Sequence, residues 1–188
     1  MKKMVANMET LEAIRARHSV RDYTNKPVER EKILAILDAA SRAPSGMNRQ
    51  PWHFLVLTEE ESRKKALSAN SIYNSWMNKA PVLIVALADS KAFYGREEQK
   101  TYLFDVGLAV ENLLLAATEL GLGACVTIGF SAEKLQRELN IPERYIPIVL
   151  ISVGYESKEK IAEPLIKGIT HSINKKKNFD EVVSFERI

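Results

Sequence analysis

Residues 96–120 read REEQKTYLFDVGLAVENLLLAATEL and predict the longest helix of the chain. Apolar residues recur along it at alternating steps of three and four, which is the spacing of one helix face. They are Leu103, Val106, Val110, Leu113, Ala117 and Leu120. This seam continues for about two and a half heptads, so it favours packing along the whole helix.

Shorter helices and apolar, β-prone stretches lie on both sides of this segment. Four strands are predicted, at residues 52–57, 81–88, 123–128 and 146–155. Four further helices are predicted, at residues 10–17, 29–42, 59–69 and 131–139. We expect Thr10 and Ser131 to cap two of these helices, with Leu11 and Ile14 facing inward. The mixture predicts an α+β or α/β fold with about four core strands.

The length of 188 residues indicates one domain over residues 1–188. After Gly154 the periodicity fades, and we expect an extended C-terminal arm over about residues 155–188. Its apolar residues need a surface to pack on, and a second subunit would provide one. They are Ile161, Leu165, Ile166, Val182, Val183 and Phe185.

The composition excludes several classes of protein. A net charge of +3 is too weak to argue for nucleic acid as a partner. The longest apolar runs are less than half the ~20 residues that span a bilayer, so no membrane segment is expected. The single cysteine requires no oxidising compartment, and residues 1–8 do not resemble a signal peptide. We therefore expect a cytoplasmic protein.

The chain lacks the usual signatures of self-sufficient catalysis. His18, His53 and His171 are widely separated, which argues against a metal site. Gly121 and Gly123 precede a predicted strand and lack the third glycine of the dinucleotide fingerprint. Cys125 is a possible nucleophile, but a buried strand thiol is favoured. If the chain is an enzyme, an organic cofactor should carry the reaction.

Two stretches offer candidate binding groups. Arg17, Ser19 and Arg21 are spaced by two, so on an extended segment they would converge on one phosphate. Alternatively, Arg17 complements a helix C-terminus and Arg21 is solvated. Residues 43–52 form a rigid loop rich in hydrogen-bonding side chains, which is either functional or a structural turn.

Residues 17–23 (RHSVRDY) and 43–54 (APSGMNRQPWHF) together resemble the two signature motifs of the nitroreductase family. The order and separation of the two motifs also match. Further resemblances follow at residues 105–117, 120–130 and 175–183. The resemblance covers almost the whole chain from Met8.

The resemblance implies a mixed, mostly antiparallel sheet flanked by helices. It also implies an intertwined homodimer built on the long helix, with the C-terminal arm on the partner. FMN would bind at the interface, and the reaction would be ping-pong. NAD(P)H would reduce the flavin, and a nitroaromatic, a quinone or a related small-molecule acceptor would then take two electrons.

Roles carry over by resemblance. Arg17 and Ser19 match phosphate ligands, His18 a backbone contact to the flavin, and Arg21 the cation near the flavin pyrimidine. The residues that the partner subunit contributes to the site are matched by Pro44, Ser45, Gly46 and Asn48. The backbone near flavin N5 is matched by Ile128 and Gly129. No side chain is expected to act as a general acid.

The chain departs from the family pattern in places. Ile128 is aliphatic where an acidic residue is common, so only a backbone role is expected there. The tail arginine is replaced by Lys176, with Lys175 and Lys177 as alternatives. Either Asn70 or Asn74 is expected to contact the flavin. Trp76 and Phe93 lie in the variable middle region and either line the substrate pocket or belong to the core.

Two alternative functions stay open. One is a flavin-binding sensor or chaperone without turnover, and the other is a specialised enone reductase or dehalogenase of the same family.

Overall fold

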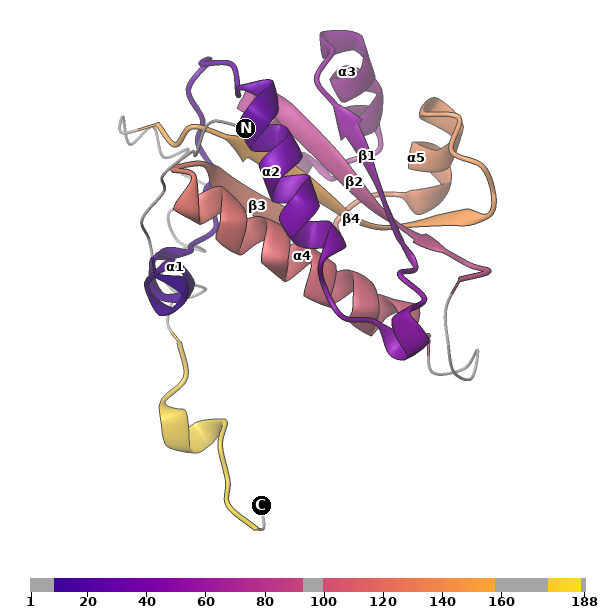
Figure 1. The fold of residues 1–188 in the computed structure, drawn as a ribbon. Helices are drawn as coiled ribbons and strands as arrows, with labels where there is room; N and C mark the ends of the chain where they lie inside the picture. Colours follow the sequence, from indigo (N-terminus) through magenta and orange to yellow (C-terminus); the bar gives the residue numbers. More distant parts are fainter. Residues whose placement is uncertain (1–8, 93–99, 158–175, 187–188) are drawn as a thin grey trace. The chain divides into compact units, whose positions relative to one another are not determined.

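The computed structural model describes residues 9–92, 100–157 and 176–186 of the chain. The chain divides into two compact units, Met1–Ser157 and Lys158–Ile188. Phe93 and Lys175, which the sequence analysis singled out, lie outside the described residues. The first unit contains a sheet with helices on both faces (Figure 1). In the second unit the described part contains a short 3-10 helix, η4 (Phe179–Glu181).

The sheet has four strands, as the sequence predicted. They are β1 (Trp52–Leu57), β2 (Val82–Asp89), β3 (Gly123–Thr127) and β4 (Tyr145–Gly154). Their order is β1-β2-β4-β3, and every neighbouring pair is antiparallel. β2 is buried along its whole length, which confirms that its apolar run faces a core on both sides. This arrangement makes the fold α+β.

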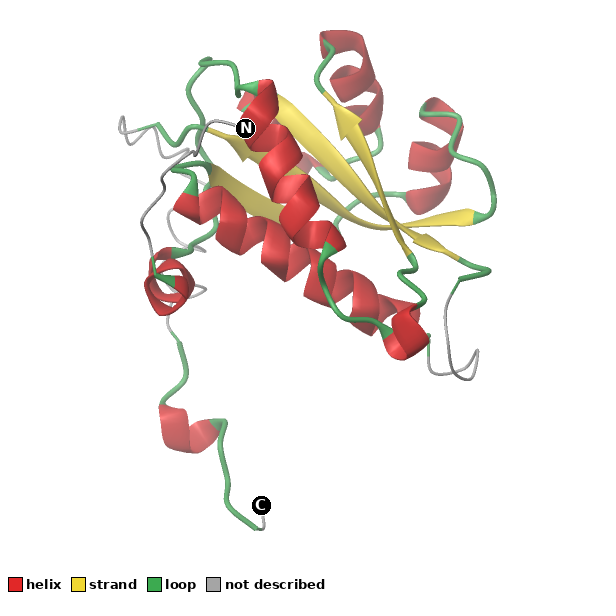
Figure 2. Cartoon of the chain, viewed as in Figure 1, coloured by secondary structure: helices red, strands yellow, loops and turns green. Residues whose placement is uncertain are grey.

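Helices cover the two faces of the sheet in separate layers (Figure 2). One face carries α2 (Arg30–Ser41) and α4 (Tyr102–Glu119). The other carries α3 (Glu60–Ser68), α5 (Ala132–Glu138) and the 3-10 helix η2 (Ile72–Lys79). Alternate residues of β2 divide between the two cores, Ile84 packing with α4 residues and Val85 with Met77 of η2. Such alternation follows from the two-residue period of a strand.

The apolar seam of α4 faces the chain's own core. Val106, Val110, Leu113 and Ala117 are buried in the cluster that includes β2 and α2, whereas Leu103 is exposed. The seam therefore gives no support of its own to packing between chains. Burial against a sheet and burial against a partner helix produce the same spacing in the sequence.

Helix α1 (Thr10–Ala16) differs from its prediction in two respects. Glu9 occupies the N-cap position and makes no side-chain capping bond, so Thr10 is the first helical residue. Leu11 is 63% and Ile14 50% exposed, whereas Ala13 is the buried residue of this helix. The expectation that Leu11 and Ile14 face inward was wrong for the described chain. In contrast, Ser131 caps α5 as predicted, accepting a hydrogen bond from the Lys134 amide.

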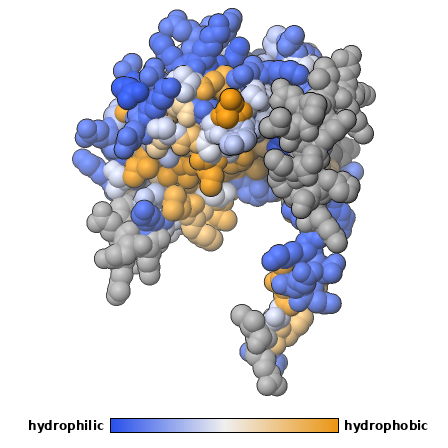
Figure 3. All heavy atoms as spheres, turned by 180° about the vertical axis from the view of Figure 1, so that it is seen from behind, coloured by the Kyte–Doolittle hydropathy of each residue, from blue (hydrophilic) through white to orange (hydrophobic). Residues whose placement is uncertain are grey.

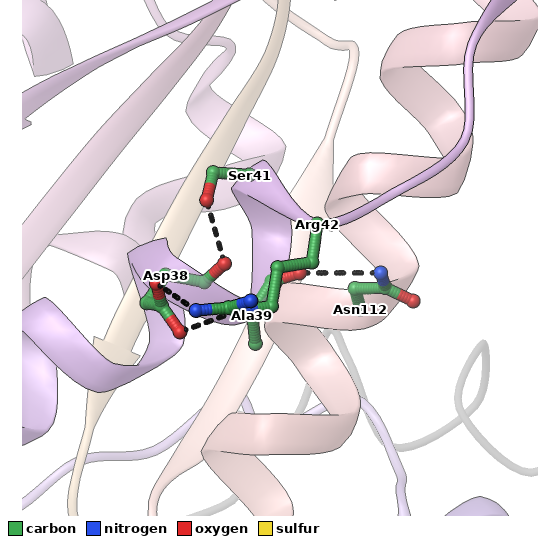
Figure 4. Close-up of polar contacts among 5 residues, drawn as sticks. All are labelled: Asp38, Ala39, Ser41, Arg42 and Asn112. Carbon is green, nitrogen blue, oxygen red and sulfur yellow. Dashed lines mark hydrogen bonds and ion pairs between the residues drawn. The ribbon is translucent and has the colours of Figure 1, made fainter. Parts of the chain in front are cut away.

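The junction of α2 with α4 fixes where the loop after α2 begins (Figure 4). The Asn112 side-chain amide on α4 donates to the Ala39 carbonyl at 3.2 Å. Arg42 forms an ion pair with Asp38 one turn earlier, at 2.8 Å. The Asn112 bond holds the last turn of α2 against the middle of α4, immediately before residues 43–51, whereas the Arg42–Asp38 pair lies within the end of α2 itself.

A glycine terminates α4 at its C-terminal end. Gly121 has a φ of +70°, in the left-handed region that glycine adopts at helix ends. The Leu122 amide then donates to the Ala117 carbonyl at 2.8 Å. Gly121 therefore has a structural role at the end of α4. Its presence two residues before Gly123 needs no dinucleotide-binding site to explain it. Among the described residues, no helix combines the length and apolarity that crossing a membrane requires.

Candidate functional site

The first signature stretch lies along the outer edge of the sheet. Ser19 forms an isolated parallel bridge with Ala124 of β3, and the Val20 amide donates to the Ala124 carbonyl at 3.1 Å. The Tyr23 hydroxyl donates to the Val20 carbonyl at 2.7 Å and lies 2.7 Å from the Ser152 hydroxyl. Bridges of Ser19 with Ala124 and of Tyr23 with Glu156 hold the two ends of residues 19–23 in extended pairing, which is the condition under which a spacing of two places polar residues on one face.

Two glycines allow this close approach. A Cβ on Gly123 would lie 2.7–2.8 Å from three carbons of the Val20 side chain. A Cβ on Gly154 would lie 2.6 Å from the Pro81 ring and 2.9 Å from that of Tyr23. Contacts this short do not occur between real atoms, so both positions need glycine for the segment to reach the sheet edge.

All three predicted phosphate ligands lie near Cys125 on β3. Arg21, Ser19 and Arg17 all act on the thiol and lower its pKa, although burial outweighs them and raises it overall. Arg17 is 23% exposed and makes one long ion pair, 3.8 Å from Glu111. No hydrogen bond or ion pair joins the Arg21 guanidinium to any other residue that the structure describes. The cluster thus holds two guanidinium groups with donors to spare.

His18 lies at the solvent side of this cluster. Its Nδ1 is 3.1 Å from the Ala16 carbonyl and its Nε2 is 3.2 Å from the Glu156 carboxylate. The hydrogen bond to Ala16 and the contact with Glu156 raise the pKa of His18. The imidazole is largely exposed, so its ring has surface partners and no place in the core.

A polar corner forms where β3 ends. The Asn74 side-chain amide donates to Thr127 Oγ1 at 2.9 Å, to Asn70 Oδ1 at 3.0 Å and to the Gly129 carbonyl at 3.2 Å. Thr127 also accepts from the Gly129 amide at 3.0 Å. Ile128 projects outward with 77% of its surface exposed. The predicted pair Ile128 and Gly129 therefore occupies a fixed turn beside both candidate asparagines.

Sequence reasoning missed Thr127, which holds this corner together. No motif marks a threonine at the end of an apolar strand, and its role follows only from the return of η2 to β3. Asn74 lies directly against the turn, since a Cβ on Gly129 would be 2.9 Å from its amide nitrogen, and its hydrogen bond to the Gly129 carbonyl is exposed. Asn70 is turned inward, and its amide lies 3.3 Å from Met77 Sδ. Of the two asparagines, Asn74 is the better placed to meet a ligand.

The second signature loop is anchored to α4. The Gly46 amide faces the Asp105 carboxylate at 3.3 and 3.4 Å, and Ser45 Oγ accepts from the Gln50 amide at 2.8 Å. Asp105 is only 4% exposed, a buried acid that sequence reasoning also missed as a partner of this loop. Met47 and Asn48 have φ values of 50° and 53°, conformations that cost energy in residues other than glycine.

The two signature stretches do not meet within one chain. The loop contacts α4 at Asp105 and the cationic cluster contacts it at Glu111, six residues further along. An α-helix rises about 9 Å over six residues. No described contact joins Pro44, Ser45, Gly46 or Asn48 to the cluster. Lys176 is exposed in the second unit, whose position relative to the first is not defined.

Two further residues from the sequence analysis have clear positions. Trp76 is partly buried and packs on the core that includes Met77 and Leu135, which supports the core alternative. Cys125 is buried and forms no disulfide, as expected of a strand thiol. Its raised pKa keeps it protonated, so it is a poor nucleophile.

Comparison with known proteins identifies the family. The model of the family described as "Nitroreductase family" matches residues 14–71 and 62–155. A Methanothermobacter thermautotrophicus protein, provisionally named NADH dehydrogenase/NAD(P)H nitroreductase, is 36% identical over 82% of this chain and 81% of its own length.

Solved structures agree with this result. A nitroreductase family protein from Clostridium difficile superposes with a TM-score of 0.81 at 30% identity, over 96% of this chain and 100% of the other. A provisional nitroreductase from Desulfovibrio desulfuricans, solved in complex with FMN, gives 0.78 at 29% identity, over 95% and 97% of the two chains. Sequence, fold and signature segments agree, and the chain belongs to the nitroreductase family.

Proposed function

We propose that the chain is an FMN-dependent NAD(P)H oxidoreductase that works as a cytoplasmic homodimer. When bound, FMN supplies the redox chemistry, taking a hydride from NAD(P)H and giving two electrons to a nitroaromatic, a quinone or a related acceptor. The two substrates would use the site in turn, in a ping-pong reaction. The observation that carries this proposal is the cluster of Arg17, Ser19 and Arg21.

The cluster fits a phosphate group. A phosphate monoester carries nearly two negative charges at neutral pH, and guanidinium groups bind it through paired hydrogen bonds. Arg21 has no partner in the described parts of the chain, and the 3.8 Å contact of Arg17 with Glu111 is long for an ion pair. The Ser19 hydroxyl adds a neutral donor. The C-terminal Lys176 would complete the set if the arm reaches the site.

The ring system would then lie toward the corner at Gly129. Ile128 and Gly129 would present backbone near the hydride-exchanging atom, and Asn74 would contact the ring. The positive charge of Arg21 near the pyrimidine would stabilise the anionic reduced form. Each ~1.4 kcal/mol of this stabilisation raises a two-electron potential by about 30 mV. The protein's contribution is therefore positioning and electrostatic tuning.

A second chain would complete the site. Pro44, Ser45, Gly46 and Asn48 do not reach the cluster of their own chain, so we assign them to the site of the partner. Hydrophobic surface gathers on the face that Figure 3 shows. Apolar side chains are also exposed on the elements beside both signature stretches. These residues are Leu11 and Ile14 on α1 and Leu103 and Phe104 on α4. Burial of such a surface drives association.

The proposal is tested by titrating flavin-free protein with FMN. Arg17→Ala should weaken FMN binding by about tenfold to a hundredfold, the effect of losing a charge-assisted contact. Arg15→Ala is the matched control, because Arg15 is an exposed arginine in the last turn of α1, the helix whose C-cap is Arg17. Unchanged binding in Arg17→Ala would refute the site assignment.

Rapid mixing with NADH and NADPH separates this enzyme from the alternative, a passive flavin binder. The nicotinamide should reduce the bound flavin only if the protein is the enzyme.

A further inference from the structure

A groove at one end of the sheet has no role in the site described above. It has a volume of about 440 Å³, within the range of small-molecule sites. The loop before α2, helix α3 and the junction of η2 with β2 form its walls. The residues that matter for its chemistry are Arg63, Lys79, Asn25, Asn78, Pro27 and Pro81.

The groove is positively charged and rigid. Arg63 and Lys79 both line it and none of the described lining residues is acidic, but the Lys79 ammonium forms an ion pair with Asp22 at 3.0 Å, so Arg63 supplies the cation that makes no ion pair with any described residue. Proline rings on two sides restrict the backbone of the walls. An adjoining hollow that shares Arg63 and Asn78 with the groove is lined by both Lys64 and Glu60, which form an ion pair at 2.5 Å.

Arg63 is held in a fixed orientation with donors to spare. Its Nη1 donates to the Pro81 carbonyl at 2.9 Å and also to the Thr58 carbonyl. Its Nε and Nη2 make no hydrogen bond to any residue in the described part of the chain. An arginine fixed in this way is suited to bind a phosphate, because little side-chain freedom is lost on binding. The amides of Asn25 and Asn78 likewise have no described partner and offer further donors.

One short element, η2, connects the groove to the polar corner at Gly129, where we place the flavin ring. η2 begins beside Gly129, where Asn74 binds the turn, and ends at Lys79, which lines the groove. Lys79 lies five positions after Asn74, which corresponds to about 10 Å at the rise of a 3-10 helix. Tyr73 lies on the same element with 75% of its surface exposed and offers a ring for stacking. A dinucleotide with its nicotinamide at the corner is long enough to reach the groove.

We propose that this groove binds the 2′-phosphate of NADPH and makes the protein prefer NADPH over NADH. This inference rests on the proposed function, since it needs the nicotinamide to lie at the flavin corner. NADPH differs from NADH only by this phosphate, so a cationic groove at the adenosine end is the feature that discriminates between them. The Nε and Nη2 donors of Arg63, which bond no described residue, would meet the phosphate, with the asparagine amides and the Asp22-paired Lys79 at its edge.

The test measures ligand binding in the groove by calorimetry, without the redox reaction, and the preference between NADPH and NADH by the kinetics of that reaction. Calorimetry with adenosine 2′,5′-bisphosphate detects the groove directly, and 5′-AMP and inorganic phosphate serve as comparison ligands. Asn78→Asp places a negative charge in the groove without removing a described contact. Asn140→Asp makes the same change on an exposed turn after α5 and is the matched control. Arg63→Gln is a second variant that removes the fixed cation.

We expect the bisphosphate to bind the wild type more tightly than either comparison ligand. In Asn78→Asp its affinity and the ratio of kcat/KM for NADPH over NADH should both fall about tenfold or more. The control should keep both values. Equal binding in the variant, an unchanged ratio, or inorganic phosphate binding as tightly as the bisphosphate would each overturn the proposal. Failure of both nicotinamides to reduce the flavin would instead refute the proposed function, and the calorimetry would still decide the groove.

Discussion

Val20 packs so closely against Gly123 that no side chain fits between them. The distances of 2.7–2.8 Å to a Cβ at residue 123 involve all three carbons of a β-branched side chain, which is stiff. The bond between Val20 and Ala124 joins the same two segments. This contact fixes the position of Ser19 and Arg21, so a packing relationship in the core determines where the cationic cluster lies.

Gly123→Ala should therefore damage the cluster from a distance. Forcing a methyl group against Val20 should cost about 1–3 kcal/mol of stability, the usual effect of overpacking. The segment would move away from β3, and FMN affinity should fall although no ligand-contacting side chain has changed. Urea unfolding and FMN titration of the same protein would measure both effects. Full stability together with full affinity would show that the segment does not depend on this contact.

The outer face of α4 provides a prediction about association. A Cβ on Gly107 would meet nothing within 4 Å among the residues of its own chain that the structure describes, although glycine weakens a helix interior. We expect a second chain to occupy this space. Gly107→Phe should weaken the dimer by about tenfold to a hundredfold through overpacking, as seen by sedimentation. Glu119→Phe adds the same bulk at the other end of α4 and should leave the dimer intact. Identical behaviour of the two variants would contradict this interface.

Cys125 should be inert in the native protein. Burial raises its thiol pKa despite the two nearby arginines, so little thiolate is present at neutral pH. A thiol reagent should react only as fast as the chain opens, and Cys125→Ala should preserve turnover with FMN. Rapid labelling of the folded protein, or loss of turnover in the variant, would revive a nucleophilic role.

FMN affinity should decrease as the pH rises through the titration of His18. Its contacts with Ala16 and Glu156 raise its pKa above 6.5. Protonated His18 beside the cluster would attract the phosphate, so the contribution is fully present below pH 6.5 and is lost above the raised pKa. Because the ring is exposed, we expect an effect of at most about fivefold, corresponding to 1 kcal/mol. His18→Asn should remove this pH dependence, and a dependence that persists in the variant would assign it to another group.

Local patterns predicted most of the fold. β1 occupies residues 52–57 as expected, and Ser131 caps α5, because an apolar run and a capping residue act through their immediate neighbours. The inward face of α1 and the partner of the α4 seam were not predictable in this way. An apolar stripe shows that a helix is buried on one side, but not against which surface.

The same limit applies to the candidate site. The spacing of Arg17, Ser19 and Arg21 predicted a shared face, and all three lie near Cys125 on the edge strand β3, whereas their shared binding of a phosphate stays a prediction. Asp105 and Thr127 escaped notice because their partners are distant in sequence, Gly46 and Asn74 respectively. A buried polar residue acquires its role from tertiary contacts, and no local pattern records them.

The central claim is that the cluster at Arg17 and Arg21 holds FMN and that the bound flavin accepts electrons from NAD(P)H. An anaerobic visible absorption spectrum tests it most directly, recorded for wild type and for Arg21→Met before and after addition of NADPH or NADH. The account predicts flavin absorption in the wild type that bleaches with a nicotinamide, and weaker flavin retention in the variant. A colourless wild-type protein that also takes up no added FMN would contradict it.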